Sequence, residues 1–321
     1  MTKPTLVESN EIFIIDYNKL VNIKHEIEPN NEVKKIAKDL REAFQYKKAV
    51  FLVNHTISKE DENKVYSLIR KFSALPNPIK EKYKSIINTG YHGYTSQQSE
   101  RINKDGLIEF KESYNIIGYN RYLPDEEISE FSKTINTITE KLLNISNILL
   151  QLFAISLELS LDSFLPYHEN MFDHLLNRTT FRILNYPPVN RPSSHFSDII
   201  RCGEHTDYGT FSLIMQDSEG GLEIVASDGK WRRVGHIPGA MLILTAFLFE
   251  VLTSGKYKAT LHRVIVPEEE EVRNKSRNSI AFFVTSDEKS VIKPLFPTPE
   301  MEVKEYITGE YLMEKLNEIK L

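Results

Sequence analysis

The chain has 321 residues and a net charge of −5, with a sequence pI near 6.0. This composition predicts an ordinary soluble globular protein and argues against a nucleic-acid partner, which usually needs a basic face. The single cysteine, Cys202, rules out an intrachain disulfide, and we expect it to be a small buried apolar residue. No basic segment followed by an apolar run begins the sequence, and the longest apolar stretch, 240–249, is too short to span a bilayer. These features predict a cytoplasmic protein with no membrane partner.

In the first half of the sequence, helical patterns alternate with short strands. Residues 13–16 and 49–53 are apolar runs typical of strands. The segment 89–94, rich in glycine and tyrosine, is expected to be a loop. Apolar residues recur at intervals of three and four in several segments, which predicts helices at 32–46, 59–73, 79–83 and 131–152. The last helix carries one continuous apolar stripe, so we expect it to pack against a sheet rather than to bind a partner.

From Thr179 onward, apolar alternation with period two and regular glycine or proline turns predict β-structure. The expected strands are 180–184, 211–215, 222–225, 231–234, 240–245, 262–266 and 279–284. Many short strands of this kind predict an antiparallel sandwich or barrel, and residues 304–319 return to a helical pattern. We therefore expect a helical and strand region at 1–120, backing helices at 121–178 and a β core at 179–321, packed as one compact monomeric unit.

Three side chains of the β region have the character of metal ligands. His205 and Asp207 are two residues apart, and side chains at that spacing in a strand share one face. His262 begins a later expected strand and completes a set of two imidazoles and one carboxylate, which can bind one face of Fe(II) and leave open positions. Zinc hydrolases use the same ligand types, so these three residues alone leave both kinds of site open.

Arg277 and Ser279 form a second pattern. In a strand both side chains face the same side, where a guanidinium can hold a carboxylate through two parallel hydrogen bonds and a hydroxyl adds a third. The apolar run 280–283 follows directly, which favours a buried carboxylate site over a surface salt bridge. Together with the three ligand-type residues, this pattern favours an oxygenase over a hydrolase.

These motifs resemble the iron(II)/2-oxoglutarate-dependent oxygenases of the isopenicillin N synthase-like type. The resemblance covers nearly the whole chain. The matching segments, in chain order, are VNHTI at 53–57, FSALP at 72–76, GYHGY at 90–94, KE at 111–112, NYPP at 185–188, EHTDYG at 204–209, GGLEI at 220–224, IPG at 237–239, TLHRV at 260–264 and RNS at 277–279. Because so many motifs occur in order, a chance match is very improbable.

The resemblance implies a mainly β fold with flanking helices, whose core is a distorted double-stranded β-helix, or jelly roll. It implies that His205, Asp207 and His262 bind Fe(II). It also implies that Arg277 and Ser279, helped by Tyr186, bind the cosubstrate 2-oxoglutarate, with O2 as the second cosubstrate. His55, a motif histidine far from these ligands in sequence, is expected to be structural.

The sequence departs from the family pattern at two places near the expected site. The segment between His262 and Arg277 is longer than usual and includes the acidic run 268–271, expected to be a solvated loop. Arg273 stands nearer the usual distance but lacks the following serine and strand, so we assign the cosubstrate role to Arg277. Residues 244–247 replace a polar Asn-x-Gly-Asp segment, which predicts fewer hydrogen bonds around the ligands and a more apolar cavity.

The implied function is oxidation of a small organic metabolite in a biosynthetic pathway of secondary metabolism. The outcome could be hydroxylation, desaturation or oxidative ring closure, with release of succinate and CO2. An iron oxidase of the same family that uses no 2-oxoglutarate is the first alternative, and a non-catalytic ligand-binding protein on this fold is the second. Candidate substrate-binding residues are Tyr94, Arg201 and Phe247, from segments that form the substrate pocket in the family.

Overall fold

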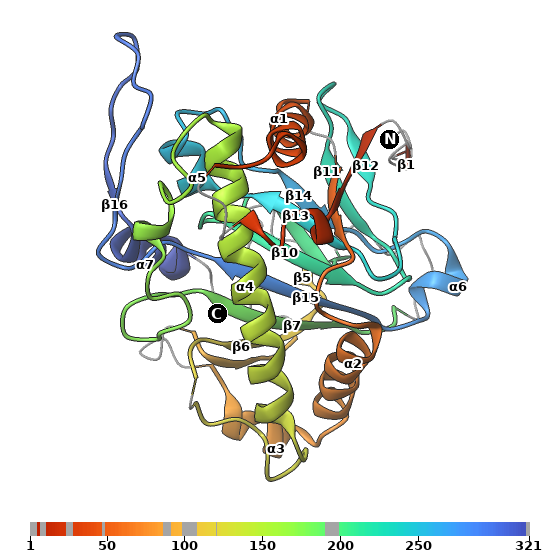
Figure 1. Ribbon diagram of the computed structural model, residues 1–321. Helices are drawn as coiled ribbons and strands as arrows, with labels where there is room; N and C mark the ends of the chain where they lie inside the picture. The colour runs from red at the N-terminus through yellow and green to blue at the C-terminus, as the bar shows by residue number, and fades with distance from the viewer. Residues whose placement is uncertain are drawn as a thin grey trace.

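Two β-sheets pack face to face, and helices cover the outer face of the larger sheet (Figure 1). The computed structural model describes residues 5–6, 11–23, 28–46, 49–85, 91–97, 108–119, 121–189 and 199–318. The helices are α1 (Asn31–Gln45), α2 (Lys59–Ser73), α3 (Asn77–Lys80), α4 (Phe131–Ser156), α5 (Phe247–Leu252), α6 (Glu270–Arg273) and α7 (Thr308–Glu318).

The larger sheet has eight strands in the order β2-β3-β13-β10-β15-β7-β6-β4. Strands β2 and β3 are parallel, and the other neighbours in this sheet are antiparallel. The bounds are β2 (Ile12–Asp16), β3 (Ala49–Val53), β4 (Gly93–Thr95), β6 (Glu112–Ile116), β7 (Thr180–Tyr186), β10 (Phe211–Gln216), β13 (Met241–Thr245) and β15 (Arg277–Val284).

The smaller sheet has five strands in the order β1-β12-β11-β14-β9. Their bounds are β1 (Thr5–Leu6), β9 (Cys202–His205), β11 (Leu222–Val225), β12 (Trp231–Arg233) and β14 (His262–Val264). Two further pairs join β5 (Ile108–Glu109) to β8 (Ile199–Ile200) and β16 (Val291–Ile292) to β17 (Tyr306–Ile307).

The central strands divide their side chains between two cores. In β10, Phe211, Leu213 and Met215 pack in the core beneath the helices, whereas Ile214 packs in the core between the two sheets. This division follows from the period-two alternation of side chains along a strand. Strands β7 and β15 alternate in the same way, so one face of each strand is directed toward the space between the sheets.

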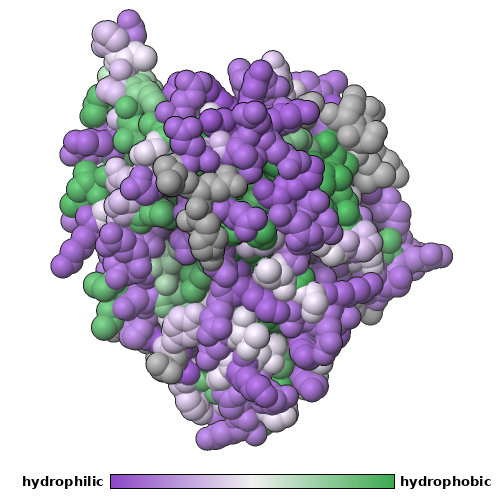
Figure 2. All heavy atoms as spheres, in the orientation of Figure 1, coloured by the Kyte–Doolittle hydropathy of each residue, from purple (hydrophilic) through white to green (hydrophobic). Residues whose placement is uncertain are grey.

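Helix α4 has the length and apolar composition of a membrane-spanning helix, but its surroundings are those of a core helix. In its most apolar window, 61% of the residues are buried inside the protein. The helix runs across the larger sheet beside α1 and α2, and most of the surface on that face is hydrophilic (Figures 1 and 2). The apolar stripe predicted at 131–152 therefore packs in the protein's own core.

The predicted fold class is confirmed, since the two large, mainly antiparallel sheets belong to a double-stranded β-helix. In the N-terminal region, the strands expected at 13–16 and 49–53 form β2 and β3, and together with β4 and β6 they extend the larger sheet. Strand β6 carries polar residues without apolar alternation, and pairing with β7 defines it. The division of the chain at 120 and 178 stays a prediction.

Candidate active site

Strand alternation and sheet pairing build one cavity between the two sheets, here called the Arg277 cavity. Strands β7 and β15 of the larger sheet line one wall, and β9, β11 and β14 of the smaller sheet line the other. The lining residues are Lys111, Arg182, Leu184, Tyr186, Cys202, His205, Asp207, Ile214, Leu222, His262, Val264, Arg277, Ser279, Ala281 and Phe283. All six residues predicted to bind metal or cosubstrate are among them.

His205, Asp207 and His262 meet in the wall of this cavity. One ligand-type atom of each residue lies within 4.8 Å of the other two. The Nε2 atoms of His205 and His262 are 3.6 and 3.8 Å from Asp207 Oδ1. Antiparallel pairing sets His262 opposite His205, with 4.3 Å between the ring centroids. Two nitrogen donors and one oxygen donor therefore converge on one point, as a facial site for Fe(II) requires.

Hydrogen bonds determine which atom of each ligand is available to a metal. His205 Nδ1 bonds the carbonyl oxygen of Gly203 at 2.8 Å, and His262 Nδ1 bonds that of Thr260 at 2.9 Å. Because a carbonyl oxygen accepts hydrogen bonds, Nδ1 carries the proton in each neutral ring, and Nε2 keeps its lone pair. The Ser212 hydroxyl donates to Asp207 Oδ2, which leaves Oδ1 toward the imidazoles.

Electrostatics at the three ligands favour an anionic carboxylate. Burial opposes the charge of Asp207, but His262, His205 and Ser212 outweigh it and hold the pKa of Asp207 well below its usual range. Burial and the charge of His205 lower the pKa of His262 to about 4. Burial also disfavours a charge on His205, yet Cys202 and Asp207 raise the pKa of His205 well above its usual value. In the metal-free protein a proton on His205 therefore offsets the Asp207 charge, and a bound cation would replace that proton.

Two expectations about these ligands need correction. Strand β9 ends at His205, so Asp207 lies in the following loop rather than on a shared strand face. The start of α5 holds that loop, because the N–H groups of Phe247 and Leu248 donate to the carbonyl oxygens of Asp207 and Tyr208 at 2.9 and 3.1 Å. The apolar segment 244–247 thus orients the ligand loop through its backbone, and Ser212 supplies the polar contact predicted to be missing.

Arg277 is buried at the start of β15, with 1% of its surface exposed. Its Nη2 donates to Gln216 Oε1 at 2.9 Å and its Nη1 to Ser279 Oγ at 3.3 Å. The guanidinium carbon lies 4.7 Å from the centroid of the Tyr186 ring, which stands opposite Arg277 in the paired strand. Its Nε has no hydrogen-bond partner. A buried cation with an unpaired N–H fits a bound carboxylate.

Arg273, the competing arginine, lies elsewhere. It ends the short helix α6, and its Nη1 donates to the carbonyl oxygen of Glu268 at 2.7 Å. Arg273 does not line the Arg277 cavity or the second cavity described in the next paragraph. The acidic run 268–271 is exposed, as expected, although its second half forms the first turn of α6 rather than a loop. The assignment of the carboxylate-binding role to Arg277 therefore agrees with the geometry.

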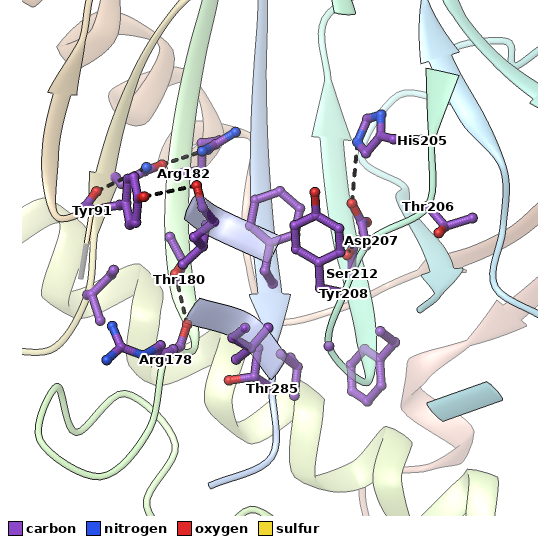
Figure 3. Close-up of a pocket in the computed structure, with 18 residues that line it drawn as sticks. Tyr91, Arg178, Thr180, Arg182, His205, Thr206, Asp207, Tyr208, Ser212 and Thr285 are labelled. Atoms are coloured by element: carbon purple, nitrogen blue, oxygen red, sulfur yellow. Dashed lines mark hydrogen bonds and ion pairs between the residues drawn. The ribbon is translucent and has the colours of Figure 1, made fainter. Parts of the chain in front are cut away.

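A second cavity, here called the Tyr208 cavity, opens on the other side of the metal ligands (Figure 3). Its volume is about 120 Å³. Figure 3 shows His205 and Asp207 on one side and Tyr91, Thr180 and Arg182 on the other. The two cavities share four residues, Arg182, His205, Asp207 and Phe283, so a molecule in the Tyr208 cavity lies next to the metal ligands.

None of the three predicted substrate residues lines either cavity. Tyr94 donates to Glu112 Oε2 at 2.8 Å inside a buried network, 5.3 Å from the Phe72 ring. Phe247 stacks on Tyr311 at 5.1 Å, behind the ligand loop. Arg201 is completely buried, with its Nη2 donating to the carbonyl oxygen of Lys275 at 3.4 Å. The two aromatic residues pack in the core in this structure, and a substrate-binding role for the three residues stays a prediction.

The structure adds residues that the sequence reading did not select. Arg182 and Phe283 stand at the junction of the two cavities, with Arg182 Nε donating to Asn115 Oδ1 at 2.6 Å. Lys111 lines the Arg277 cavity, 2.7 Å from Glu109 Oε2 and 3.4 Å from Cys202 Sγ. Strand alternation could have identified Arg182 and Phe283, because residues four positions apart in a strand share one face. Arg182 is four residues before Tyr186, and Phe283 is four residues after Ser279. Lys111 belongs to the KE segment at 111–112, to which the resemblance assigned no role.

Two protein-family models match the chain. The model of the 2OG-Fe(II) oxygenase superfamily matches residues 173–286, a segment that holds the three ligand residues, Arg277 and Ser279. A model described as non-haem dioxygenase in morphine synthesis N-terminal matches residues 12–138. Together these segments cover most of the chain, in the order that the family arrangement requires.

Individual proteins are similar over similar lengths. A UPF0676 protein of Schizosaccharomyces pombe is 28% identical over 303 residues, which cover 89% of each chain. A 2-oxoglutarate-dependent dioxygenase of Didymella fabae is 26% identical over 256 residues, covering 73% of this chain and 74% of its own length. The crystal structure of a full-length Neurospora crassa protein in complex with alpha-KG and thymine matches with a TM-score of 0.82 at 22% identity, covering 99% of this chain and 98% of that one. This last likeness shows a shared fold.

Proposed function

Because the chain belongs to the 2OG-Fe(II) oxygenase superfamily, we propose that this Fe(II)- and 2-oxoglutarate-dependent oxygenase oxidises a small organic metabolite bound in the Tyr208 cavity. One observation carries the proposal. Three ligand atoms converge on one point: Nε2 of His205, Oδ1 of Asp207 and Nε2 of His262. This point lies between the Tyr208 cavity and the buried Arg277, whose Nε has no hydrogen-bond partner.

Six residues that line the Arg277 cavity have a task in this function. The two imidazoles and the carboxylate would hold the iron, and their hydrogen bonds to Gly203, Thr260 and Ser212 keep the donor atoms in place. Arg277 and Ser279, with Tyr186 against the guanidinium, would hold the distal carboxylate of 2-oxoglutarate. Iron loaded with 2-oxoglutarate and O2 supplies the oxidising power, with release of succinate and CO2.

The Tyr208 cavity supports a small-molecule substrate. A volume of about 120 Å³ accommodates a small organic molecule and not a folded polymer segment. Tyr208 and Phe283 offer aromatic surface, and Arg182 places a positive charge beside the metal ligands. We extend the proposal to hydroxylation, desaturation or ring closure in secondary metabolism, carried out by a cytoplasmic monomer.

Anaerobic titration tests the cosubstrate. Adding 2-oxoglutarate to the Fe(II)-loaded protein without oxygen should produce a weak visible charge-transfer band, because the 2-oxo acid must chelate iron for the band to appear. Arg277→Ala should raise the 2-oxoglutarate concentration needed for the band by roughly a hundredfold, as expected for a lost charge-assisted pair in a buried site. Arg273→Ala is the matched control and should titrate like the wild type.

Product analysis separates the proposal from the alternative oxidase. In air and with a true substrate, each product molecule should accompany about one molecule of succinate. A screen of candidate metabolites for stimulated succinate release would identify that substrate. If oxygen and substrate are consumed with iron alone and no succinate forms, the protein is an oxidase that does not use 2-oxoglutarate.

A further inference from the structure

Arg182 stands where the two cavities of the site meet. It lines both cavities, as do the metal ligands His205 and Asp207. Figure 3 shows Arg182 on one side of the Tyr208 cavity and the two ligands on the other. The guanidinium carbon of Arg182 lies 5.6 Å from the centroid of the Phe283 ring, which also lines both cavities. A molecule that extends from the Tyr208 cavity to the metal ligands therefore meets this positive charge.

The register of the larger sheet separates Arg182 from the distal end of the cosubstrate site. On β7, Arg182 is four residues before Tyr186, and on β15 its paired residue Ala281 is four residues after Arg277. Because a strand rises about 3.3 Å per residue, about 13 Å separates the backbone of Arg182 from that of Tyr186. The charge of Arg182 therefore serves a different part of the site from the charge of Arg277.

The other charged side chains of the Tyr208 cavity are engaged. Apart from the histidine ligand, the charged residues among those described as lining this cavity are Arg178, Arg182 and Asp207. Arg178 Nε lies 2.8 Å from Glu288 Oε1, and Asp207 is directed toward the imidazoles and the Ser212 hydroxyl. Arg182, unlike Arg178, also lines the Arg277 cavity, so it brings its positive charge next to the metal ligands.

Asn115 fixes the orientation of this guanidinium. Arg182 Nε donates to Asn115 Oδ1 at 2.6 Å, and Asn115 Nδ2 donates to the carbonyl oxygen of Tyr91 at 3.1 Å. Asn115 is 4% exposed and stands opposite Arg182 in the paired strand β6. Because the Asn115 side chain is a neutral amide, this contact orients the guanidinium and does not cancel its charge.

We propose that the substrate is a small organic carboxylate whose anionic group binds Arg182. This inference rests on the proposed function and names the substrate class of the same site. The attraction between a guanidinium and a carboxylate is strong inside a cavity, where little water screens it. Tyr208, Phe283 and Leu312 offer apolar wall for the hydrocarbon part of such a molecule. Asn115 is a positioning residue, since it acts through Arg182.

Calorimetry on the full-length chain loaded with Mn(II) and 2-oxoglutarate tests the proposal without turnover. The probes are pairs of a carboxylate and its primary amide, which have nearly the same shape and differ in charge. The pairs are benzoate with benzamide, phenylacetate with phenylacetamide and hexanoate with hexanamide. At least one acid should bind the wild type about tenfold more tightly than its amide. Arg182→Met should reduce that ratio to about one, and Arg182→Lys, which keeps the charge, should retain part of it.

Two further variants separate the role of the charge from a structural role. Arg178→Met is the matched control, because it removes an arginine of the same cavity that is paired with Glu288, and it should keep the ratio. Asn115→Ala should lower the ratio about threefold or more and leave amide binding within about twofold, because the charge stays but its orientation is lost. If Arg182→Met does not fold, Arg182→Lys and Asn115→Ala carry the same test.

The proposal is overturned if the wild type favours no acid over its amide, or if the Arg182 variants keep the wild-type ratio. Arg182→Met should bind 2-oxoglutarate within about threefold of the wild type, because its backbone is about 13 Å from the residue pair assigned to the distal carboxylate. An equal loss for 2-oxoglutarate and for the acid would assign Arg182 to the cosubstrate and also overturn the proposal. If the wild type itself fails to bind 2-oxoglutarate, the proposed function fails instead.

Discussion

At the level of single residues, a few hydrogen bonds decide which atoms can bind iron. Two backbone carbonyl oxygens fix the tautomers of His205 and His262, and the Ser212 hydroxyl turns one Asp207 oxygen toward the imidazoles. The ligand set therefore depends on groups that are not themselves ligands.

Replacing any of His205, Asp207 or His262 with alanine should abolish iron-dependent turnover while the fold survives. Each change removes one of three donors and leaves the metal under-coordinated. Iron content after purification and circular dichroism would test this together. His174→Ala, which changes an exposed histidine, is the control and should retain iron. Near-normal iron and activity in one ligand variant would remove that residue from the set.

Ser212→Ala should weaken metal binding about 10- to 100-fold, the usual effect of losing a hydrogen bond to a metal ligand. The carboxylate of Asp207 would then be free to rotate away from the common point. Competition with a coloured chelator measures the affinity, and Ser212→Thr, which keeps the hydroxyl, should remain near the wild type. Equal affinities for alanine and wild type would show that Ser212 does not orient Asp207.

At the level of elements, α7 closes the Tyr208 cavity from the C-terminal end of the chain. Leu312 and Leu316 of this helix form part of the cavity wall. The Tyr91 hydroxyl donates to the carbonyl oxygen of Leu316 at 2.9 Å, which ties the helix to the segment before β4. Access to the cavity should therefore depend on how firmly α7 is held.

Tyr91→Phe should loosen α7, because it removes this hydrogen bond and leaves the ring in place. A loss of about 1 kcal/mol corresponds to roughly fivefold faster amide hydrogen exchange in the last turns of the helix. Exchange mass spectrometry would measure it, with the exposed Tyr46 changed to phenylalanine as the control. Unchanged exchange in α7 would mean that apolar packing alone holds the helix.

At the level of the whole molecule, buried neutral histidines couple stability to pH. His168 is 3% exposed and lies between the carbonyl oxygen of Phe164 and the Thr210 hydroxyl, each at 2.8 Å. Burial lowers the pKa of His168 to about 4. Burial likewise lowers the pKa values of His92 and His262 to about 4 in the metal-free protein.

The metal-free protein should lose stability as the pH falls from about 6.5 toward 4. In that range the unfolded chain binds protons at these histidines and the folded protein does not, so protons favour unfolding. For His168 alone the contribution present above pH 6.5 is at most about 3 kcal/mol. Urea unfolding at pH 7 and pH 5 would measure the change. His168→Gln should show a smaller loss between the two pH values, and an equal loss would contradict the assignment.

The residue types of the site and the class of fold could both be predicted from the amino-acid sequence. Period-two apolar runs with regular turns predict the strands, and the ordered motifs identify His205, Asp207, His262, Arg277 and Ser279 without any coordinates. These features can be predicted because each of them, whether strand alternation or a short motif, lies within a few consecutive residues.

The side chains that surround those residues could not be predicted from the sequence and are known from the folded structure. The cavity walls come from strands that pair across long stretches of chain, so Arg182 and Phe283 reach the metal site while Tyr94 and Phe247 pack in the core. Likewise, no sequence pattern distinguishes a buried arginine with unused donors, such as Arg201, from one on the surface. The physical reason is that burial and pairing depend on contacts between distant segments, which sheet closure creates and local sequence does not encode.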